Sequence, residues 1–279
     1  MTRAKAIPGP GKPPRSRSLK APRARLPHVR TLTAPPPLPS LPRLPPHAFV
    51  DVDTGLIHVH PPHGGPAHHA PGIRRALAGA LWPHYDHTRA PQKRARSSAA
   101  EGLRVESGIA AYMAAQRDNA PAPPLRHRYE RAFVEWADRA GLVYAGAQLP
   151  LYDPVTGIAT RIDLLLYDAA AHAAGRAPHV LVELKTGHVS PDAAQGRMRS
   201  ALGDAALSEW ACTPRNQAYA QLAWMRYVAR ERHGLDTRGV LAILNDRTIR
   251  LKRGPARDMP AAVVALEPAI VRAVELHAT

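Results

Sequence analysis

The chain has 279 residues, a formal net charge of +16 and a single cysteine, Cys212. That length is sufficient for one domain with a full hydrophobic core and a long tail besides. One cysteine excludes an internal disulfide framework and a four-cysteine metal site. No apolar run approaches the roughly 20 residues needed to span a bilayer, and the N-terminus lacks the apolar segment of a secretory signal. We therefore expect a soluble intracellular protein with no membrane contact and with a polyanionic partner, of which nucleic acid is the commonest.

The positive charge is concentrated in the first third of the chain. Residues 1–99 contain sixteen Lys and Arg against three Asp and Glu, while residues 100–279 contain twenty-two against nineteen. Residues 1–46 are rich in proline and have no acidic residue and no hydrophobic period. Such a segment cannot bury enough apolar surface to offset its ordering entropy. We expect residues 1–99 to form a largely disordered basic arm.

Two short ordered elements are expected inside this arm. Apolar residues on both sides of a Thr-Gly turn predict a β-hairpin over residues 48–60. Apolar residues at helical spacing predict a short helix over residues 72–82, stopped by Pro83. Five histidines between residues 58 and 69 could chelate a metal, but their Pro- and Gly-rich setting without fixed spacing is more typical of a low-complexity segment.

Residues 100–279 show the hydrophobic periodicity of a folded domain. The pattern predicts helices over about 101–117 and 125–140, strands at about 143–151, 158–167 and 179–185, a helix over 214–233, a hairpin of 239–244 with 248–252, and a last helix interrupted or kinked at Pro268. Thr213 and Gly234 are expected to cap the 214–233 helix. This order of elements predicts an α/β fold with a mixed central sheet flanked by helices.

The clearest chemical signal lies in residues 179–187, which read HVLVELKTG. Positions i and i+2 of a strand share a face, so Glu183 and Lys185 project together while Val182 and Leu184 enter the core. Two charges in a strand rich in Val and Leu are costly unless something binds them. The pattern therefore indicates a functional site at this strand.

Asp163 lies twenty residues before Glu183, on a second apolar strand. If the two strands pair, both carboxylates can meet at the end of the sheet and, with a strand carbonyl such as that of Leu184, form an oxygen site suited to Mg²⁺ or Mn²⁺. Such an ion can polarise a phosphodiester and lower the pKa of an attacking water. Lys185 would orient that water or balance charge developing on the phosphate. We predict Asp163, Glu183 and Lys185 as catalytic residues.

A structural alternative stays open at this strand. Glu183 and Lys185 could form an ordinary ion pair on a half-exposed surface, because a Glu-x-Lys pattern is common. The combination with Asp163 upstream, a Thr-Gly exit and a glutamine-bearing helix downstream favours the nuclease-like site.

Asp163, the run Glu183-Leu184-Lys185-Thr186-Gly187 and the downstream glutamines together resemble the RecB-like branch of the PD-(D/E)XK nucleases, which includes exonucleases of recombination, organellar genome maintenance and large DNA viruses. The resemblance covers about residues 100–253, and only the two acids and the lysine are specific. It implies a restriction-endonuclease-like core in which the two acids bind metal and the lysine assists the water. It also implies a glutamine followed four residues later by a tyrosine, both contacting the substrate strand.

The chain departs from that last pattern. Gln217 is followed four residues later by Gln221, and Gln221 by Met225, so Gln217 and Gln221 are the expected substrate-binding residues. Tyr219 and Tyr227 are only candidates for the tyrosine role.

An additional metal ligand on an early helix is also implied by the resemblance. Glu106 stands where the family often places a histidine or glutamate, and Glu130 on the next helix is its competitor. Each could instead be a solvated helix carboxylate. We favour Glu106.

The expected function is Mg²⁺-dependent hydrolysis of DNA phosphodiester bonds, in replication, recombination or repair. No phosphate-binding Gly-x-x-x-x-Gly-Lys-Ser/Thr pattern is present, so no ATP-driven motor is expected. Arg-rich clusters in the arm could be nuclear-targeting signals, and a virus factory is a further candidate location. The acid-poor, Arg-rich N-terminus also suits an organellar transit peptide, but its prolines oppose the amphipathic helix that such a peptide needs, so an organellar location is less expected. The alternative is a nuclease fold that has lost catalysis and serves in DNA binding or DNA packaging.

Overall fold

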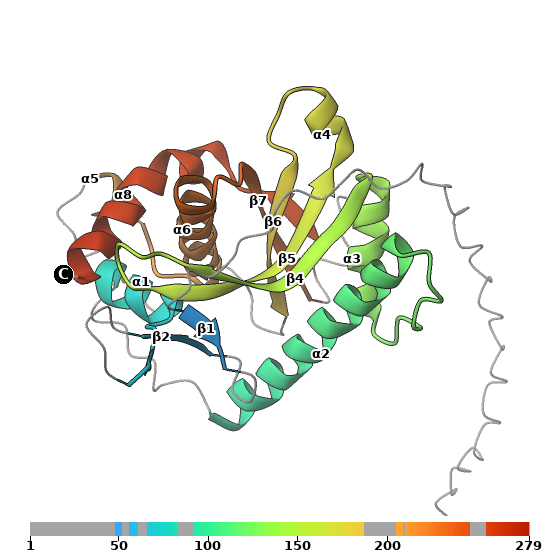
Figure 1. Ribbon diagram of the computed structural model, residues 1–279, viewed down its shortest axis with the longest axis horizontal. Helices are drawn as coiled ribbons and strands as arrows, with labels where there is room; N and C mark the ends of the chain where they lie inside the picture. The colour runs from blue at the N-terminus through green and yellow to red at the C-terminus, as the bar shows by residue number, and fades with distance from the viewer. Residues whose placement is uncertain are drawn as a thin grey trace, which may run out of the picture. The chain divides into compact units, whose positions relative to one another are not determined.

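Figure 1 shows the computed structural model, which describes residues 48–51, 56–60, 66–82, 92–186, 205–208, 210–245 and 255–278, without the side chains of residues 92–99, 205 and 206. The described residues belong to a single compact unit. The disorder expected for residues 1–46 and the strand expected at 248–252 lie outside this set.

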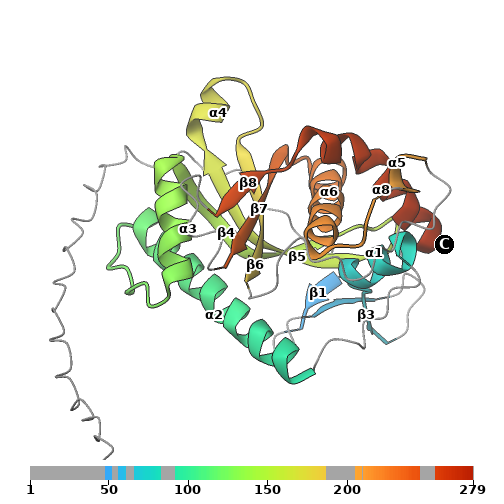
Figure 2. The same ribbon diagram turned by 180° about the vertical axis from the view of Figure 1, so that it is seen from behind.

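A five-stranded mixed sheet forms the centre of the fold. Its strand order is β4 (Leu142–Tyr152), β5 (Ala159–Asp168), β6 (His179–Thr186), β7 (Thr237–Leu244) and β8 (Ala256–Asp258). Neighbouring strands are antiparallel except β6 and β7, which are parallel. Figure 2 shows β8 at the edge of the sheet, beside β7. The three strands expected between residues 143 and 185 are therefore confirmed. Among the described residues, the antiparallel partner of β7 is β8, at residues 256–258.

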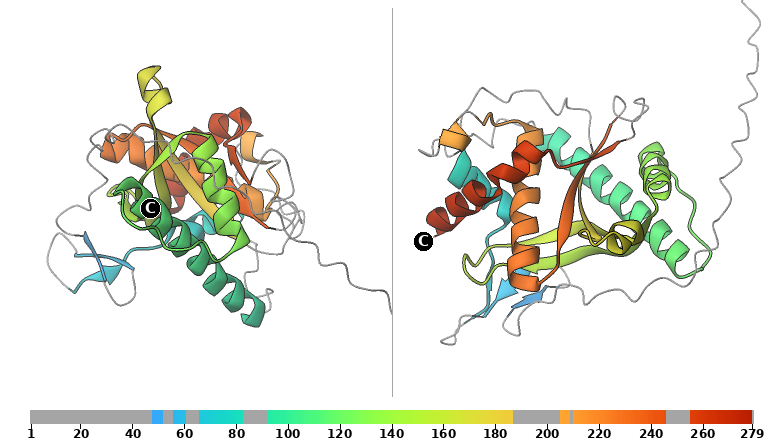
Figure 3. Two further views of the ribbon diagram at one scale, coloured as in Figure 1. Left: turned by 90° about the vertical axis from the view of Figure 1, so that its right-hand side faces the viewer. Right: turned by 90° about the horizontal axis from the view of Figure 1, so that it is seen from above.

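Helices cover both faces of this sheet (Figure 3). On one face lie α2 (Gln92–Arg117) and α3 (Arg128–Arg139), and on the other lie α1 (Ile73–Leu81), α6 (Pro214–His233) and α8 (Ala261–Ala278). Alternate residues of β6 enter the two cores: Val180 and Val182 pack with α2 and α3, whereas Leu181 packs with α6 and α8. This alternation is what a sheet buried on both faces requires. The predicted α/β class with a mixed, helix-flanked sheet is confirmed.

Helix α6 is the crossover between the parallel strands β6 and β7, which cannot be joined by a tight turn. It begins where the sequence predicts, because the side chain of Thr213 accepts a hydrogen bond from the backbone N–H of Asn216 at 3.1 Å. It ends at Gly234, whose φ of 62° lies in the left-handed region that favours glycine. Both predicted caps are confirmed.

A second, three-stranded sheet precedes the central one in sequence. It consists of β1 (Ala48–Val50), β2 (Ile57–Val59) and β3 (His68–His69), all antiparallel. The expected hairpin is confirmed in β1 and β2. Strand β3 was not foreseen, because two histidines in a Pro- and Gly-rich segment carry no periodic signal. The inner face of this sheet packs against Tyr152 and Ala159 of the central sheet.

The boundary expected between an arm of residues 1–99 and a domain of residues 100–279 falls inside α2, which starts at Gln92. Helix α1 also belongs to the folded unit, since its apolar side, including Ile73 and Leu81, is buried in the core shared with α6 and α8. The helical spacing predicts α1 correctly, but spacing alone does not show which surface an amphipathic helix covers.

Smaller differences from the expectation concern the helices. Two short helices are not among the elements predicted above: α4 (Ala169–Ala173), capped by the side chain of Asp168, follows β5, and α5 (Ala205–Ser208) lies before α6. Helix α3 starts later than expected, behind a His127 cap. The last helix, α8, is not interrupted at Pro268, which lies inside it. None of the described helices has the length and apolarity to span a membrane.

Candidate functional site

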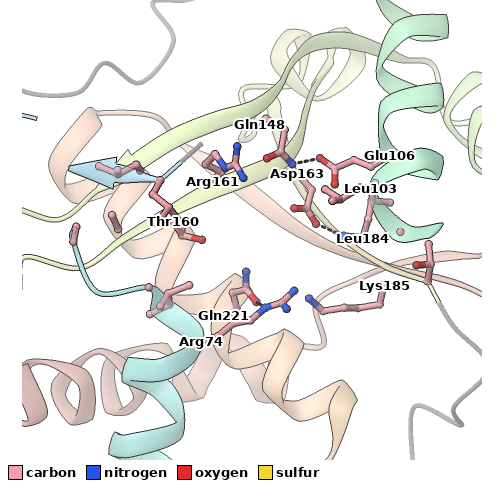
Figure 4. Close-up of a pocket in the computed structure, with 18 of the residues that line it drawn as sticks. Arg74, Leu103, Glu106, Gln148, Thr160, Arg161, Asp163, Leu184, Lys185 and Gln221 are labelled. Carbon is pink, nitrogen blue, oxygen red and sulfur yellow. Dashed lines mark hydrogen bonds between the residues drawn. The ribbon is translucent and has the colours of Figure 1, made fainter. Parts of the chain in front are cut away.

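A cleft of about 650 Å³ opens beside the C-terminal end of β6, between the N-terminal half of α2 and the α1 and α6 helices. Its charged and amide side chains are Arg74, Glu106, Gln148, Arg161, Asp163, Lys185 and Gln221. Figure 4 shows Glu106, Gln148 and Asp163 together on one side, with Arg74, Gln221 and Lys185 facing them. The cleft therefore brings together distant parts of the chain, such as Arg74 and Gln221, which are 147 positions apart.

The register of the central sheet brings Asp163 next to Glu183. The last cross-strand pair of β5 and β6 is Leu164 with Val182, so Asp163 and Glu183 are the next opposed positions. Opposed residues of an antiparallel pair share a face. Asp163 is tied to β6 by its Oδ2 atom, which accepts a hydrogen bond from the backbone N–H of Leu184 at 2.8 Å. The strand pairing on which the predicted site depends is thus present.

Glu183 is completely buried and does not itself line the cleft, although its neighbours Asp163 and Lys185 do, and its charge is only partly compensated. One carboxylate oxygen forms an ion pair with the Nζ atom of Lys185 and lies 3.9 Å from the guanidinium of Arg74. The other, Oε2, has no hydrogen-bond partner among the described residues. An unpaired buried carboxylate oxygen is expensive in free energy, because it has lost its water without a replacement. The ion pair expected under the structural alternative is therefore present, but it compensates only the Oε1 atom of Glu183 and leaves Oε2 without a partner among the described residues.

Both acids that line the cleft have raised pKa values. Burial raises the pKa of Asp163 well above its ordinary value, and the neighbouring charge of Glu183 raises it further, while Lys185 lowers it. Burial also raises the pKa of Glu106; a hydrogen bond from Gln148 opposes this shift, and the charge of Glu183 adds to it. A bound cation would lower both pKa values, because it favours the charged form of a carboxylate.

Glu106 reaches the cleft because α2 approaches β6 closely at Gly102, one helical turn earlier. A Cβ atom on Gly102 would lie 2.9 Å from the Oγ1 atom of Thr186, so a larger residue would require the Thr186 side chain or the helix to shift. The competitor Glu130 has another role, since its Oε2 atom accepts a hydrogen bond from the backbone N–H of His127 at 2.8 Å and so caps α3. Of the two candidate metal ligands, only Glu106 lines the cleft.

Gln148 is a site residue that sequence reasoning missed. Its φ of 49° lies in the left-handed region, which residues with a side chain rarely adopt. The side-chain amide donates a hydrogen bond to the Oε1 atom of Glu106. Backbone strain of this kind persists where the surrounding structure enforces it, often at functional sites. No sequence signal marks the position, because a glutamine inside a strand is unremarkable.

Two cationic residues of the cleft were also missed. Arg74 reaches it from α1, where its Nε atom donates a hydrogen bond to Gln221 Oε1 at 3.4 Å. Nothing in the sequence connects α1 with residues more than a hundred positions later. Arg161 was detectable, since it lies two positions before Asp163 on β5 and therefore shares its face of the strand.

The two predicted substrate-binding glutamines are not equivalent. Gln221 lines the cleft, whereas the side-chain amide of Gln217 contacts the Sγ atom of Cys212 at 3.1 Å and is not part of the lining. Four residues advance a helix by about 6 Å and rotate it about 40° beyond a full turn, so one glutamine can face the cleft alone. Tyr219 is buried in the core, and Tyr227 lies beneath the guanidinium of Arg232, so neither candidate tyrosine lines the cleft.

Within the described ranges, no three His, Cys, Asp or Glu side chains are gathered as a ready-made metal cage. A magnesium ion does not need one, since it usually keeps several waters and takes one or two carboxylates from the protein. The paired Asp163 and Glu183, with the unpartnered Oε2 atom of Glu183, fit that requirement. No protein-family model and no curated protein matches the sequence significantly.

Proposed function

We propose that this protein is a Mg²⁺- or Mn²⁺-dependent nuclease that hydrolyses phosphodiester bonds of DNA on a restriction-endonuclease-like core. The observation that carries the proposal is the juxtaposition of Asp163 and Glu183 on the neighbouring strands β5 and β6, beside Lys185, where the charge of Glu183 raises the pKa of Asp163. Two carboxylates placed side by side repel each other and contribute nothing to the stability of a fold, so such pairs are typical of functional sites.

The fold supports the proposal through its connections. Helices α2 and α3 precede the antiparallel strands β4, β5 and β6, and the crossover helix α6 leads to the parallel strand β7. The mixed sheet with helices on both faces is the core expected from the PD-(D/E)XK resemblance. The two acids lie on its second and third strands, so the cleft forms where those strands meet.

Each polar side chain of the cleft has a role in this proposal. Asp163 and Glu183, with the carbonyl of Leu184, would hold the divalent ion, which when bound supplies Lewis-acid activation of the phosphodiester and of water. Lys185 balances charge developing on the phosphate or orients the water. Arg74 and Arg161 provide guanidinium groups, which match phosphate geometry, and Gln221 contacts the substrate strand.

One observation favours a second candidate, a nuclease fold that binds or packages DNA without cutting it. Lys185 is engaged with Glu183 in an ion pair, as it would be if both were only structural. In that case no divalent ion would bind at the cleft and the net charge of +16 alone would carry the affinity for DNA.

Cleavage assays on the full-length chain separate the two candidates. Linear duplex, circular duplex, single-stranded DNA and RNA are each incubated with Mg²⁺, Mn²⁺ or a chelator, and Asp163→Asn is assayed in parallel as the control for contaminating nucleases. We expect cleavage of DNA that requires the divalent ion and is lost in Asp163→Asn. Intact DNA under all conditions, with unchanged binding in the variant, would establish the non-cleaving alternative.

A further inference from the structure

An aromatic row crosses the outer face of the three-stranded sheet. Phe49 of β1 is opposite His58 of β2, and His58 is opposite His69 of β3. The rings of Phe49 and His58 are stacked with centroids 5.6 Å apart, the rings of His58 and His69 are 6.0 Å apart, and His60 lies 5.4 Å from Phe49. We refer to Phe49, His58, His60 and His69 as the aromatic row.

The core of the protein does not require this row. The inner face of the small sheet supplies the apolar packing, with Ile57 and Val59 buried against Tyr152 and Ala159. Phe49 is 41% exposed although it is a large apolar residue. Rings that touch one another on a solvent-facing surface present their outer faces to whatever binds there.

The aromatic row leads into the cleft. His69, at one end of the row, lines the cleft, as does Ile57 of the neighbouring strand. Arg74 lines the same cleft, its side chain is 75% exposed and its guanidinium lies 3.9 Å from the buried Glu183. One end of the aromatic row and a cationic group close to the proposed catalytic carboxylates therefore belong to one cleft.

We propose that the aromatic row binds the unpaired bases of a single-stranded nucleic acid, whose backbone then passes Arg74 into the cleft. The binding surface is argued from its own contacts, while its role in guiding a strand to the carboxylates rests on the proposed nuclease function. Every base has a π-face that stacks on aromatic side chains, and stacking is independent of sequence. The bases of a duplex already stack on one another, so a duplex offers no such faces. The expected substrate is therefore a single strand or the unpaired end of a duplex.

Charge complementarity favours nucleic acid over a protein partner for this surface. The cleft that His69 lines also contains Arg74 and Arg161, and the chain as a whole carries a net charge of +16. A groove that combines cationic groups for the backbone with rings for the bases is the usual design of single-strand binding.

Fluorescence anisotropy on the full-length protein tests the surface separately from the chemistry. A labelled single-stranded oligonucleotide and a duplex of the same length are titrated in a chelator, which prevents metal-dependent cleavage, at near-physiological salt. Phe49→Ala and His58→Ala are each expected to weaken single-strand binding by roughly tenfold while changing duplex binding by less than about twofold. Phe49→Tyr is expected to bind like the original protein, because it keeps the ring.

The matched control is His68→Ala. His68 is adjacent to His69 and exposed, but it pairs with Val59 and so lies on the other face of β3. It is expected to leave both affinities unchanged, and thermal melting of every variant checks that the fold is retained. Equal single-strand binding by the original protein, Phe49→Ala and His68→Ala would overturn the inference even if DNA is cleaved. Ring-dependent single-strand binding without any cleavage would instead uphold the surface and refute the nuclease.

Discussion

Two buried glutamates of this protein have opposite surroundings. Glu267 of α8 lies between two arginines of α6, with Arg226 and Arg230 each 3.1 Å from a different carboxylate oxygen. Each glutamate has an Oε2 atom without a hydrogen-bond partner among the described residues, but that of Glu267 forms an ion pair with Arg226, whereas both ion pairs of Glu183 involve its Oε1 atom. Glu183 also raises the pKa of Asp163 beside it. At the α6–α8 site the carboxylate faces two guanidinium groups, whereas at the cleft the carboxylates of Asp163 and Glu183 lie beside each other.

This difference separates acids that stabilise the fold from acids that are expected to serve a function. A carboxylate held between two guanidinium groups joins helices, and its removal should affect stability first. Acids that destabilise one another persist where a function needs them, because natural proteins depart from local consistency mainly at functional sites. We therefore expect the two sites to respond oppositely to substitution.

The largest contrast is expected between Asp163→Asn and Glu267→Gln. The first should reduce the cleavage rate by roughly a hundredfold to ten-thousandfold, because it removes a ligand of an ion that contributes several kcal/mol to the transition state. The melting temperature of this variant should be unchanged or higher, since an uncharged amide is not repelled by the neighbouring Glu183. Glu267→Gln should lose about 1–3 kcal/mol of stability and keep its cleavage rate below its melting point. Cleavage rates and thermal melts of both variants measure this, and a Glu267→Gln variant that loses activity while folded would erase the distinction.

The next largest effect is expected for Lys185→Ala. If Lys185 acts in the transition state, the variant should lose most of its turnover, by about a hundredfold, while its DNA affinity stays nearly intact. If Lys185 is only the ion-pair partner of Glu183, its removal should mainly lower stability. Melting and cleavage are measured on the same preparation, and a destabilised variant that cleaves at the original rate would show that the lysine is structural.

A smaller effect is expected for Arg74→Ala. Loss of a phosphate-binding guanidinium should raise KM or lower kcat/KM by about tenfold. Arg75→Ala is the matched control, because Arg75 is the next residue of α1 and does not line the cleft. Steady-state kinetics of both variants, with Arg74→Lys as a partial rescue, test the assignment. Equal kinetics for the Arg74 and Arg75 variants would remove Arg74 from the site.

The smallest effect is a pH dependence of stability. Because burial and Glu183 raise the pKa of Asp163, the folded state holds this proton more tightly than the unfolded state does. The resulting stability is fully present below the ordinary aspartate pKa of about 3.9 and is lost as the pH rises through the raised value. In metal-free buffer, Asp163→Asn should therefore gain on the original protein by about 2–4 °C in melting temperature between pH 4 and pH 7. A difference that is constant over this range would contradict the raised pKa.

The sheet and the acids were predictable from the sequence because their signals are local. Short apolar runs separated by turn residues locate β4, β5 and β6, and the i, i+2 rule places Glu183 and Lys185 on one face of a strand. Thr213 and Gly234 fix the ends of α6 through capping chemistry that needs no distant partner. These elements were sufficient to predict that Asp163 and Glu183 lie on neighbouring strands.

The remaining site residues depend on contacts between distant segments. Arg74 enters the cleft only because α1 packs on α6 and α8, and the sequence shows that α1 is amphipathic without showing what it covers. Gln148 lines the cleft and has a left-handed backbone conformation, which the sequence does not predict for a glutamine inside a strand. Gln217 also depends on tertiary contacts: its position on a helix was predicted correctly, but its side chain contacts Cys212 and does not line the cleft.

Calorimetric titration with Mn²⁺ tests most directly whether the cleft carboxylates form a metal site. The account predicts saturable binding to the full-length protein, lost in Asp163→Asn and in Glu183→Gln and retained in Glu267→Gln, which keeps every residue of the cleft. Melting curves confirm that each variant is folded under the conditions of the titration. Absence of binding to the original protein, or binding that survives in both Asp163→Asn and Glu183→Gln, would contradict the account.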